Sequence, residues 1–225
     1  MCVNYTPPSR AEISAIIRAD MSDPGQWPDD TWQDYAAPII RSGQTVQADA
    51  ELLVATYGMI PKRFLPPGKK HITTMNARAE TIAQKPAYTK AWRQGQTCLV
   101  PMRSLREPSY ESGRSQWWSI SMADHAPFCV AGLWRDWEEA EGGSAFSFTQ
   151  ITINADQHPL MRRFHKPEDE KRSLVIVPRS EYAAWLSCPD LEAARALLTL
   201  YPAQLMQAQP AVRMPTLKAM SPQLF

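Results

Sequence analysis

The segment FSFTQITI (residues 146–153) decides the fold class of this chain. Apolar and polar side chains alternate along it, and it is rich in β-branched and aromatic residues, so it predicts a strand with one buried face. Further apolar segments of strand length lie on both sides of it in the chain. We expect strands at residues 50–61, 97–102, 115–122, 128–137 and 173–178.

Helical patterns are interspersed among these strands. The sequence predicts helices at residues 9–21 and at part of 76–93, where Pro86 marks a boundary. It also predicts helices at 180–186 and 190–201, with Ser180 and Asp190 as their N-caps. Residues 22–38 are predicted to be irregular. Short strands with helices at intervals indicate an α+β domain, built around a bent or barrel-like mixed sheet with flanking helices.

The length and composition bound the function. With 225 residues, we expect one domain over residues 2–201 and a proline-rich tail, predicted to be loop, over 202–225. No apolar run reaches the roughly 18 residues of a membrane span, and the polar start lacks a signal peptide, so we expect a cytoplasmic monomer without membrane contact. The net charge of +1 does not indicate a globally basic nucleic-acid binder.

The cysteines do not form a metal or disulfide pattern. Cys98, Cys129 and Cys188 lie far apart without a CxxC pair, and we interpret them as buried, reduced thiols. No glycine-rich phosphate loop is present either, so we expect neither a metal nor a cofactor.

Two segments carry a local excess of positive charge, namely PKRFLPPGKKH (residues 61–71) and MRRFHK (161–166). Such segments are often solvated loops. They are alternatively the two edges of a groove that binds phosphates.

Cys2 has an unusual chemical position. Aminopeptidases remove an initiator methionine that precedes a small residue, and Cys2 would then carry a free α-amine beside its thiol. An α-amine has a reference pKa of about 7.7–8, so much of it is a neutral nucleophile near neutral pH. An accidental cysteine at a frayed terminus is the alternative interpretation.

Several segments occur in a familiar order. These are Cys2, YAAP (35–38), YGMIP (57–61), NARAET (76–81), CLVP (98–101) with Glu107, AGLW (131–134), and NA…PLM…H (154–165) followed by Arg172. This order resembles the SRAP family, the SOS response-associated peptidases that process abasic sites in DNA, over roughly residues 2–188.

The resemblance implies a partner and a reaction. The partner is single-stranded DNA that contains an abasic site, bound in a positively charged groove during the DNA damage (SOS) response, next to the nucleoid. The amine of Cys2 attacks the ring-opened aldehyde to give a Schiff base, and its thiol then adds to that imine. The product is a thiazolidine that links protein and DNA covalently, with lyase activity or self-reversal as a further possibility.

The resemblance assigns a catalytic set of Cys2, Asn76, Glu107 and His165. Glu107 is the expected general acid and base, and His165 is expected to hydrogen-bond the opened sugar and assist imine chemistry. Asn76 is the expected amide that positions Cys2 or the sugar. Without the resemblance, Glu107 would be interpreted as a solvated loop carboxylate and His165 as a surface histidine in a basic loop.

The expected DNA contacts are Arg78, Arg162 and Arg163 as phosphate ligands and Pro38 as a shaping residue. We interpret Glu80 as a partner of Arg78 or as a buried base. Tryptophan side chains can stack on bases of a single strand, although we expect most of the eight to lie in the core.

The sequence also departs from the family pattern. Val3 and Asn4 replace the usual Gly-Arg, residues 103–106 replace Asp-Gly-Phe-Tyr, and Pro108 follows Glu107. Residues 62–64 replace a tryptophan-rich stretch, and Arg172-Ser173-Leu174 stands for Arg-Met-Pro after a longer insertion. Two other functions therefore stay open: an N-terminal cysteine peptidase, and a DNA-binding module that has lost its reactivity.

Overall fold

The strand Ser144–Asn154 (β9) is the one around which the larger sheet closes. The computed structural model describes residues 3–21, 25–43, 49–188 and 190–211, so Cys2 lies outside the described residues. Over its length β9 pairs in an antiparallel manner with Phe128–Glu138 (β8) and in parallel with Ala50–Tyr57 (β3). The expected strand at 146–153 is thus confirmed, with partners on both of its edges.

Five strands form a closed, mixed barrel in the order β9–β3–β2–β5–β8 and back to β9, with β2 spanning Ala36–Ser42 and β5 spanning Thr97–Met102. Three short strands extend this sheet: β4 (Asn76–Arg78) and β10 (Arg172–Leu174), which pair with β9, and β11 (Ile176–Val177), which pairs with β8. The single α+β domain around a curved sheet is therefore confirmed.

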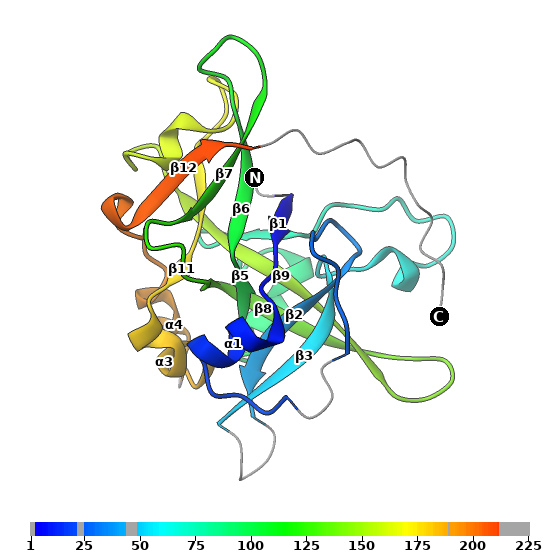
Figure 1. Cartoon of the computed structure of the whole chain (residues 1–225). Coiled ribbons are helices and arrows are strands. Elements are labelled where there is room, and N and C mark those ends of the chain that lie inside the picture. The colour runs from blue at the N-terminus through cyan, green and yellow to red at the C-terminus, as the bar shows by residue number, and fades with distance from the viewer. Residues whose placement is uncertain (1–2, 22–24, 44–48, 189, 212–225) are drawn as a thin grey trace.

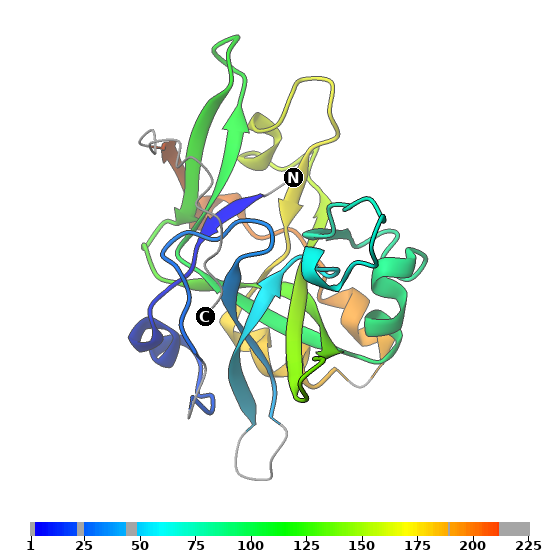
Figure 2. The same ribbon diagram turned by 90° about the vertical axis from the view of Figure 1, so that its right-hand side faces the viewer.

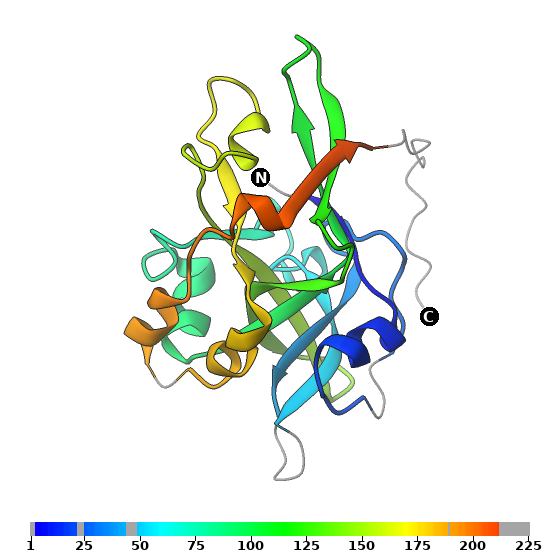
Figure 3. The same cartoon turned by 60° about the vertical axis from the view of Figure 1, so that its left-hand side comes forward.

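A second, antiparallel sheet projects from one end of the barrel (Figures 1 and 3). It has the order β1–β6–β7–β12, and its strands are Asn4–Thr6 (β1), Ser104–Ser109 (β6), Gln116–Met122 (β7) and Met206–Pro210 (β12). This sheet joins the two ends of the described chain, because β1 and β12 form its opposite edges.

The helices are short. They are α1 (Arg10–Ile16), α2 (Pro86–Arg93), α3 (Tyr182–Leu186) and α4 (Leu191–Ala196), with 3-10 turns η1 (Lys62–Phe64), η2 (Met161–Arg163), η3 (Arg179–Glu181) and η4 (Ala203–Leu205). Ser9 begins α1 through a capping box with Glu12. None of the described helices is long and apolar enough to cross a membrane.

The barrel strands are buried on both faces. Consecutive residues of a strand point to opposite faces, and Ile39 and Ile40 accordingly belong to two different apolar clusters. The cluster that contains Ile40 also contains Trp92 of α2 and Trp185 of α3, so helices cover that face. The cluster that contains Ile39 includes Leu105 and Ile120 of the second sheet.

Some sequence expectations are wrong in specific ways. The helix expected at 9–21 ends at Ile16, and the segment 76–93 begins as strand β4 and becomes helical only at Pro86. The irregular segment 22–38 includes the start of β2 at Ala36. The loop expected after Tyr201 is wrong over 203–210, where η4 leads into β12, an edge strand of the second sheet.

Candidate functional site

The centre of the candidate site is a hydrogen bond between two buried side chains, Glu107 and His165. The His165 Nε2 atom lies 3.0 Å from Glu107 Oε2, and the two side chains are only 5% and 3% exposed, His165 first. The two residues are 58 positions apart in the chain. The alternative interpretations, a solvated loop carboxylate and a surface histidine, are therefore wrong for both residues.

The backbone explains how the two side chains meet. Leu105, Glu107 and Ser109 alternate inward along β6, which places the carboxylate on the buried face. His165 has a φ of +64°, a left-handed conformation that is uncommon for residues other than glycine. Its backbone N–H donates to the carbonyl of Pro108 at 2.8 Å, which holds the imidazole beside β6.

The other imidazole nitrogen of His165 is also buried. This atom, Nδ1, has no hydrogen-bond partner among the residues that the structure describes. A buried polar atom of this kind normally has a partner. Glu107 thus orients the ring through the first nitrogen, and the second nitrogen has no partner among the described residues.

Strand β1 leads directly to this pair. Asn4 lies opposite Arg106 in the antiparallel register of β1 and β6, and Arg106 is the neighbour of Glu107. Cys2 precedes Asn4 by two positions and lies outside the described residues. Strand β1, to which Cys2 is connected through Val3, therefore lies next to the strand that carries Glu107.

A single apolar cluster supports the segments that carry the predicted catalytic residues. Its members include Tyr5 of β1, Met75 next to Asn76, Leu105 of β6 and Phe164 next to His165. Asn76 itself begins β4 and is 9% exposed. The Tyr88 hydroxyl donates to its backbone carbonyl at 3.1 Å, and the participation of its side chain in the site stays a prediction.

A cavity of about 440 Å³ opens beside His165. Arg162, Arg163 and Lys171 line it, so its walls carry positive charge. Arg163 is held on one side by a double hydrogen bond to Glu111, at 3.0 Å for each contact, and lies over the Trp118 ring. Arg162 is exposed.

Arg78, the predicted phosphate ligand, is already paired. It donates to Glu170 Oε2 at 2.6 Å, and its side chain is 48% exposed. The same carboxylate accepts from Arg172 at 2.7 Å, and this hydrogen bond, followed by one from Asn154 and by the charges of Arg172 and Arg78, lowers the pKa of Glu170. Glu170 is thus an ionised counter-charge for both arginines.

Glu80 has a different role from the one expected. Its carboxylate accepts two hydrogen bonds from Arg172, at 2.9 and 2.8 Å, and its side chain is 46% exposed. It is neither the partner of Arg78 nor a buried base. The sequence could not distinguish these arginines, because β4 and β10 flank β9 on its two sides and bring Arg78 and Arg172 to the same end of it.

Pro38 and the tryptophans differ in their exposure to solvent. Pro38 is buried in β2, opposite Val54 and before the point at which β2 begins to pair with β5. Of the eight tryptophans, Trp92 and Trp185 are buried in the core, and Trp27, Trp118 and Trp134 pack against its clusters while partly buried, so the expectation that most lie in the core holds only in part. Trp32 and Trp117 are 44% and 41% exposed.

Two side chains of the basic segment 61–71 already have acidic neighbours within the protein. Arg63 pairs with Glu139 at 3.1 Å, and His71 lies 3.7 Å from Asp34. Figures 1 and 2 show this segment and the segment around His165 in the same upper part of the molecule as β1. Both interpretations of the segment, solvated loop and groove edge, stay open.

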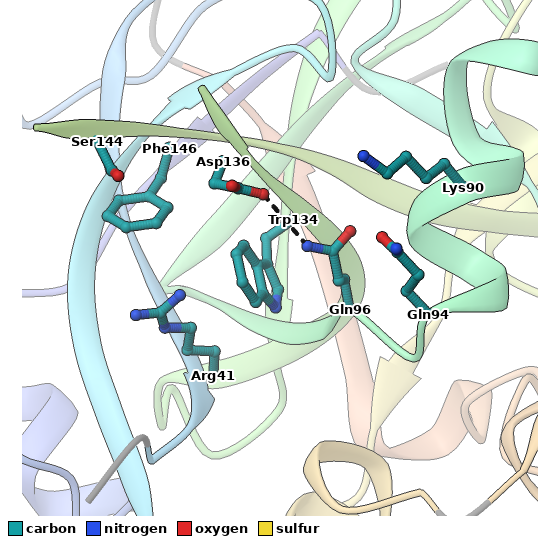
Figure 4. A pocket seen from close by; sticks show the side chains of 8 residues that line it. All are labelled: Arg41, Lys90, Gln94, Gln96, Trp134, Asp136, Ser144 and Phe146. Carbon is teal, nitrogen blue, oxygen red and sulfur yellow. Dashed lines mark hydrogen bonds between the residues drawn. The ribbon is translucent and has the colours of Figure 1, made fainter. Parts of the chain in front are cut away.

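A larger cavity on the barrel does not contain any predicted site residue. Figure 4 shows this cavity of about 730 Å³, in which Arg41 faces the rings of Trp134 and Phe146. The Arg41 guanidinium lies 4.5 and 4.8 Å from the two ring centres and also pairs with Glu51 at 3.0 Å. Its charge is therefore satisfied by the protein.

The thiols of the three described cysteines ionise less readily than an exposed cysteine. Burial raises the pKa of Cys98 well above its usual value and raises the pKa of Cys129 to about 12. Burial also raises the pKa of Cys188. Their interpretation as free thiols is confirmed, with Cys188 only partly buried. Among the described residues, no group of three or more His, Cys, Asp or Glu side chains is arranged to hold a metal ion.

Sequence reasoning missed Glu170 and Arg106 as residues next to the site. The signal for Glu170 is the run of three acidic and two basic residues in PEDEKR (167–172), which leads from His165 into β10. Arg106 lies among the residues that depart from the family pattern, so the resemblance assigned it no role.

Together, the fold and the site define a class: a single-domain α+β barrel with a buried carboxylate–imidazole pair beside its first strand. Residues 1–214 match the protein family described as "SOS response associated peptidase (SRAP)". The chain belongs to this family, as the order of its sequence segments indicated.

Solved structures agree with this assignment. A crystal structure of a protein from Bordetella bronchiseptica has a TM-score of 0.82 and 32% identity, covering 95% of this chain and 100% of that one. A structure from Bacteroides thetaiotaomicron, at 20% identity and a TM-score of 0.74, covers 93% of this chain and 91% of that one and shows the shared fold.

Two relatives carry names that describe the processing of abasic sites. The abasic site processing protein YobE of Bacillus subtilis is 30% identical over 60% of this chain. The abasic site processing protein HMCES of Xenopus tropicalis is 24% identical over 74%. The matches span 59% and 55% of these relatives' own lengths.

Proposed function

We propose that this chain captures abasic sites in single-stranded DNA by a covalent bond to Cys2. The observation that carries the proposal is the buried hydrogen bond between Glu107 and His165. Glu107 lies on β6, the strand that pairs with β1. The names of the two relatives, both abasic site processing proteins, support the same substrate.

The reaction needs two groups on one residue. After removal of Met1, the Cys2 amine adds to the sugar aldehyde, and the resulting carbinolamine loses water to form an imine. The Cys2 thiol then adds across the C=N bond, and its proton passes to the nitrogen. Because both groups belong to one residue, this ring closure is intramolecular and has a high effective molarity.

Glu107 and His165 supply the proton transfers in this proposal. Loss of water from the carbinolamine requires a proton donor at the hydroxyl, and attack by the amine requires a proton acceptor. The hydrogen bond fixes the imidazole, and burial of both side chains excludes bulk water from them. Positioned acid–base groups of this kind contribute about 10²–10⁴-fold to a rate.

The cationic side chains beside His165 are proposed to bind the DNA backbone. Arg162, Arg163 and Lys171 line the cavity next to the imidazole. Arg78, on β4, pairs with Glu170, which is the chain neighbour of Lys171. Guanidinium groups bind phosphates through paired N–H donors. The strand's phosphates would then hold the abasic sugar against His165.

A peptidase built on the same residues is the second candidate, because the family description names that activity. In that case the Cys2 thiol would attack a peptide carbonyl instead of an imine carbon. The product would be a cleaved peptide, and no DNA adduct would form.

Intact-mass measurement distinguishes these proposals. We expect the purified protein to lack Met1 and, with a single-stranded oligonucleotide containing one abasic site, to gain the oligonucleotide's mass minus one water. An oligonucleotide with a tetrahydrofuran abasic analogue, which has no aldehyde, is the matched control and should give no adduct. Retained Met1, or no adduct with the aldehyde-bearing strand, would contradict the proposal.

A further inference from the structure

Arg106, on the strand that carries Glu107, contacts both Asn4 of β1 and Asp30. Arg106 donates through Nη1 to Asp30 Oδ1 at 2.8 Å, and the same nitrogen donates to the side-chain oxygen of Asn4. The Arg106 and Asp30 side chains are 19% and 20% exposed, so they lie mostly out of solvent. Arg106 is the residue next to Glu107 and lies opposite Asn4 in the sheet.

Asp30 extends this network to the other end of β1. Its carboxylate oxygen Oδ1 also accepts a hydrogen bond from the Thr6 hydroxyl at 3.2 Å. Asn4 and Thr6 are the first and last residues of β1. A single carboxylate is therefore linked to both ends of the strand, directly at Thr6 and through Arg106 at Asn4.

The main chain around Asp30 completes the enclosure of β1. Tyr5 and Thr31 exchange backbone hydrogen bonds of 3.3 and 2.9 Å, and the Asn4 side-chain amide donates to the Thr31 carbonyl at 3.0 Å. Asn4, Tyr5 and Thr31 are all nearly completely buried. The segment at 30–31 thus lies along β1 on the side opposite β6.

A strand of three residues needs such support. β1 has few ladder hydrogen bonds, and segments near a chain terminus are poorly ordered unless they are tied down. A partly buried ion pair is screened less by salt than an exposed one. The Asp30–Arg106 pair therefore contributes to the position of β1 as well as to its retention in the sheet.

We propose that Arg106 and Asp30 are positioning residues, which hold β1, and through it Cys2, in register with Glu107 and His165. This assignment rests on the proposed function, because it concerns the residue proposed to react. A misplacement of about 1 Å can lower a rate by about a hundredfold. The expected defect is therefore in the rate of crosslinking and not in DNA affinity.

The test compares Arg106→Met with Arg103→Met. Arg103 pairs with Glu12 of α1, and its substitution removes the same charge close to β6 without touching β1's side chains. At saturating abasic single strand, Arg106→Met should crosslink about tenfold or more slowly, and Arg103→Met should retain the wild-type rate. Affinity for the intact single strand should change by less than about twofold in both variants.

Two further measurements separate positioning from general destabilisation. Thiazolidine formation with a small soluble aldehyde involves no DNA contact but needs Cys2 in register with Glu107 and His165, so Arg106→Met should slow it as it slows crosslinking, whereas Arg103→Met should not. Asp30→Asn should reproduce the slow crosslinking, and the double variant should be no slower than either single variant, because the two residues act as a unit. All rates are measured below the melting temperature of each variant.

The outcomes are distinguishable. If the wild type crosslinks and both Arg106→Met and Asp30→Asn crosslink at its rate, the positioning assignment is overturned and the proposed function stands. If the two variants lose DNA affinity in parallel with rate, the residues belong to DNA binding and the assignment is also overturned. A wild type that forms no adduct overturns the proposed function and this assignment together.

Discussion

At the scale of single residues, two buried side chains carry the proposed proton transfers. Glu107 and His165 are hydrogen-bonded to each other at 3.0 Å and are almost completely buried. A buried ion pair or neutral pair of this kind is a weak source of stability, since desolvation opposes the attraction. A role in the proposed proton transfers is the function that we assign to it.

We therefore expect Glu107→Gln and His165→Gln to lower the crosslinking rate by about 10²–10⁴-fold and to change DNA affinity little. The glutamine replacements keep a polar group of similar size. Glu141→Gln, in the exposed turn between β8 and β9, is the control and should retain the wild-type rate. Single-turnover crosslinking and equilibrium binding check the two quantities, and equal losses of both would indicate a structural role.

At the scale of elements, the charged cluster that β4 and β10 form at one end of β9 determines which arginines are available to bind phosphate. Glu170 accepts from both Arg78 and Arg172, so the predicted phosphate ligand Arg78 already has an anionic partner. A DNA phosphate that binds Arg78 must compete with this carboxylate.

Glu170→Gln should accordingly raise affinity for single-stranded DNA, and Arg78→Ala should lower it across all sequences. The gain in Glu170→Gln should be absent from the double variant Glu170→Gln with Arg78→Ala, if it acts through Arg78. Binding isotherms at several salt concentrations measure these effects, because each phosphate contact contributes to the salt dependence. A Glu170→Gln variant with wild-type affinity would mean that Arg78 does not bind phosphate.

The same charged cluster predicts that the free energy of unfolding depends on pH. The pKa of Glu170 is lowered chiefly by the hydrogen bond from Arg172. Burial acts to raise the pKa of Glu80, but the hydrogen bonds from the same arginine and from backbone N–H groups outweigh it and lower that pKa. The unfolded chain therefore binds protons at a higher pH than the folded chain. The contribution is present above the ordinary value of 4.5 and is lost as the pH falls below it.

Urea unfolding between about pH 6 and about pH 3 tests this dependence. The free energy of unfolding of the wild type should fall more steeply below pH 4.5 than that of Glu170→Gln, which lacks one of the two groups. Both carboxylates are partly exposed, so we expect a modest difference. Identical slopes would contradict a lowered pKa of Glu170 in the folded chain.

The elements also show what the sequence could predict. Alternating or continuous apolar strands such as β5, β8 and β9 were predictable, because burial fixed their pattern. β6 was missed because one of its inward positions is Glu107, so its pattern resembles a loop. The catalytic candidates were identified through family resemblance, whereas Arg106 and Glu170 depend on tertiary contacts that spacing does not reveal.

At the scale of the whole molecule, the second sheet joins the start and the end of the described chain. β12 pairs with β7, buries Met206 in the cluster that supports the site, and lies at the opposite edge from β1. The strand was missed because its sequence, MQAQP, carries little apolar signal.

Removal of residues 203–225 should lower the free energy of unfolding by about 1.5–3 kcal/mol or more, the value of burying a methionine side chain. Removal of residues 212–225 alone leaves β12 in place and is the matched control. Chemical denaturation of the two truncated chains measures the difference. Equal stabilities would mean that β12 adds nothing to the fold.

Cys2 is proposed to make an imine with its amine and to close a ring with its thiol, and this division of labour is the central claim. The most direct measurement compares wild type with Cys2→Ser on abasic single-stranded DNA, on a denaturing gel, with and without borohydride. We predict a heat-stable adduct of the wild type without reductant, and an adduct of Cys2→Ser only when borohydride traps the imine. A heat-stable adduct of Cys2→Ser without reductant would contradict the claim, because the thiol could not then be the group that closes the ring.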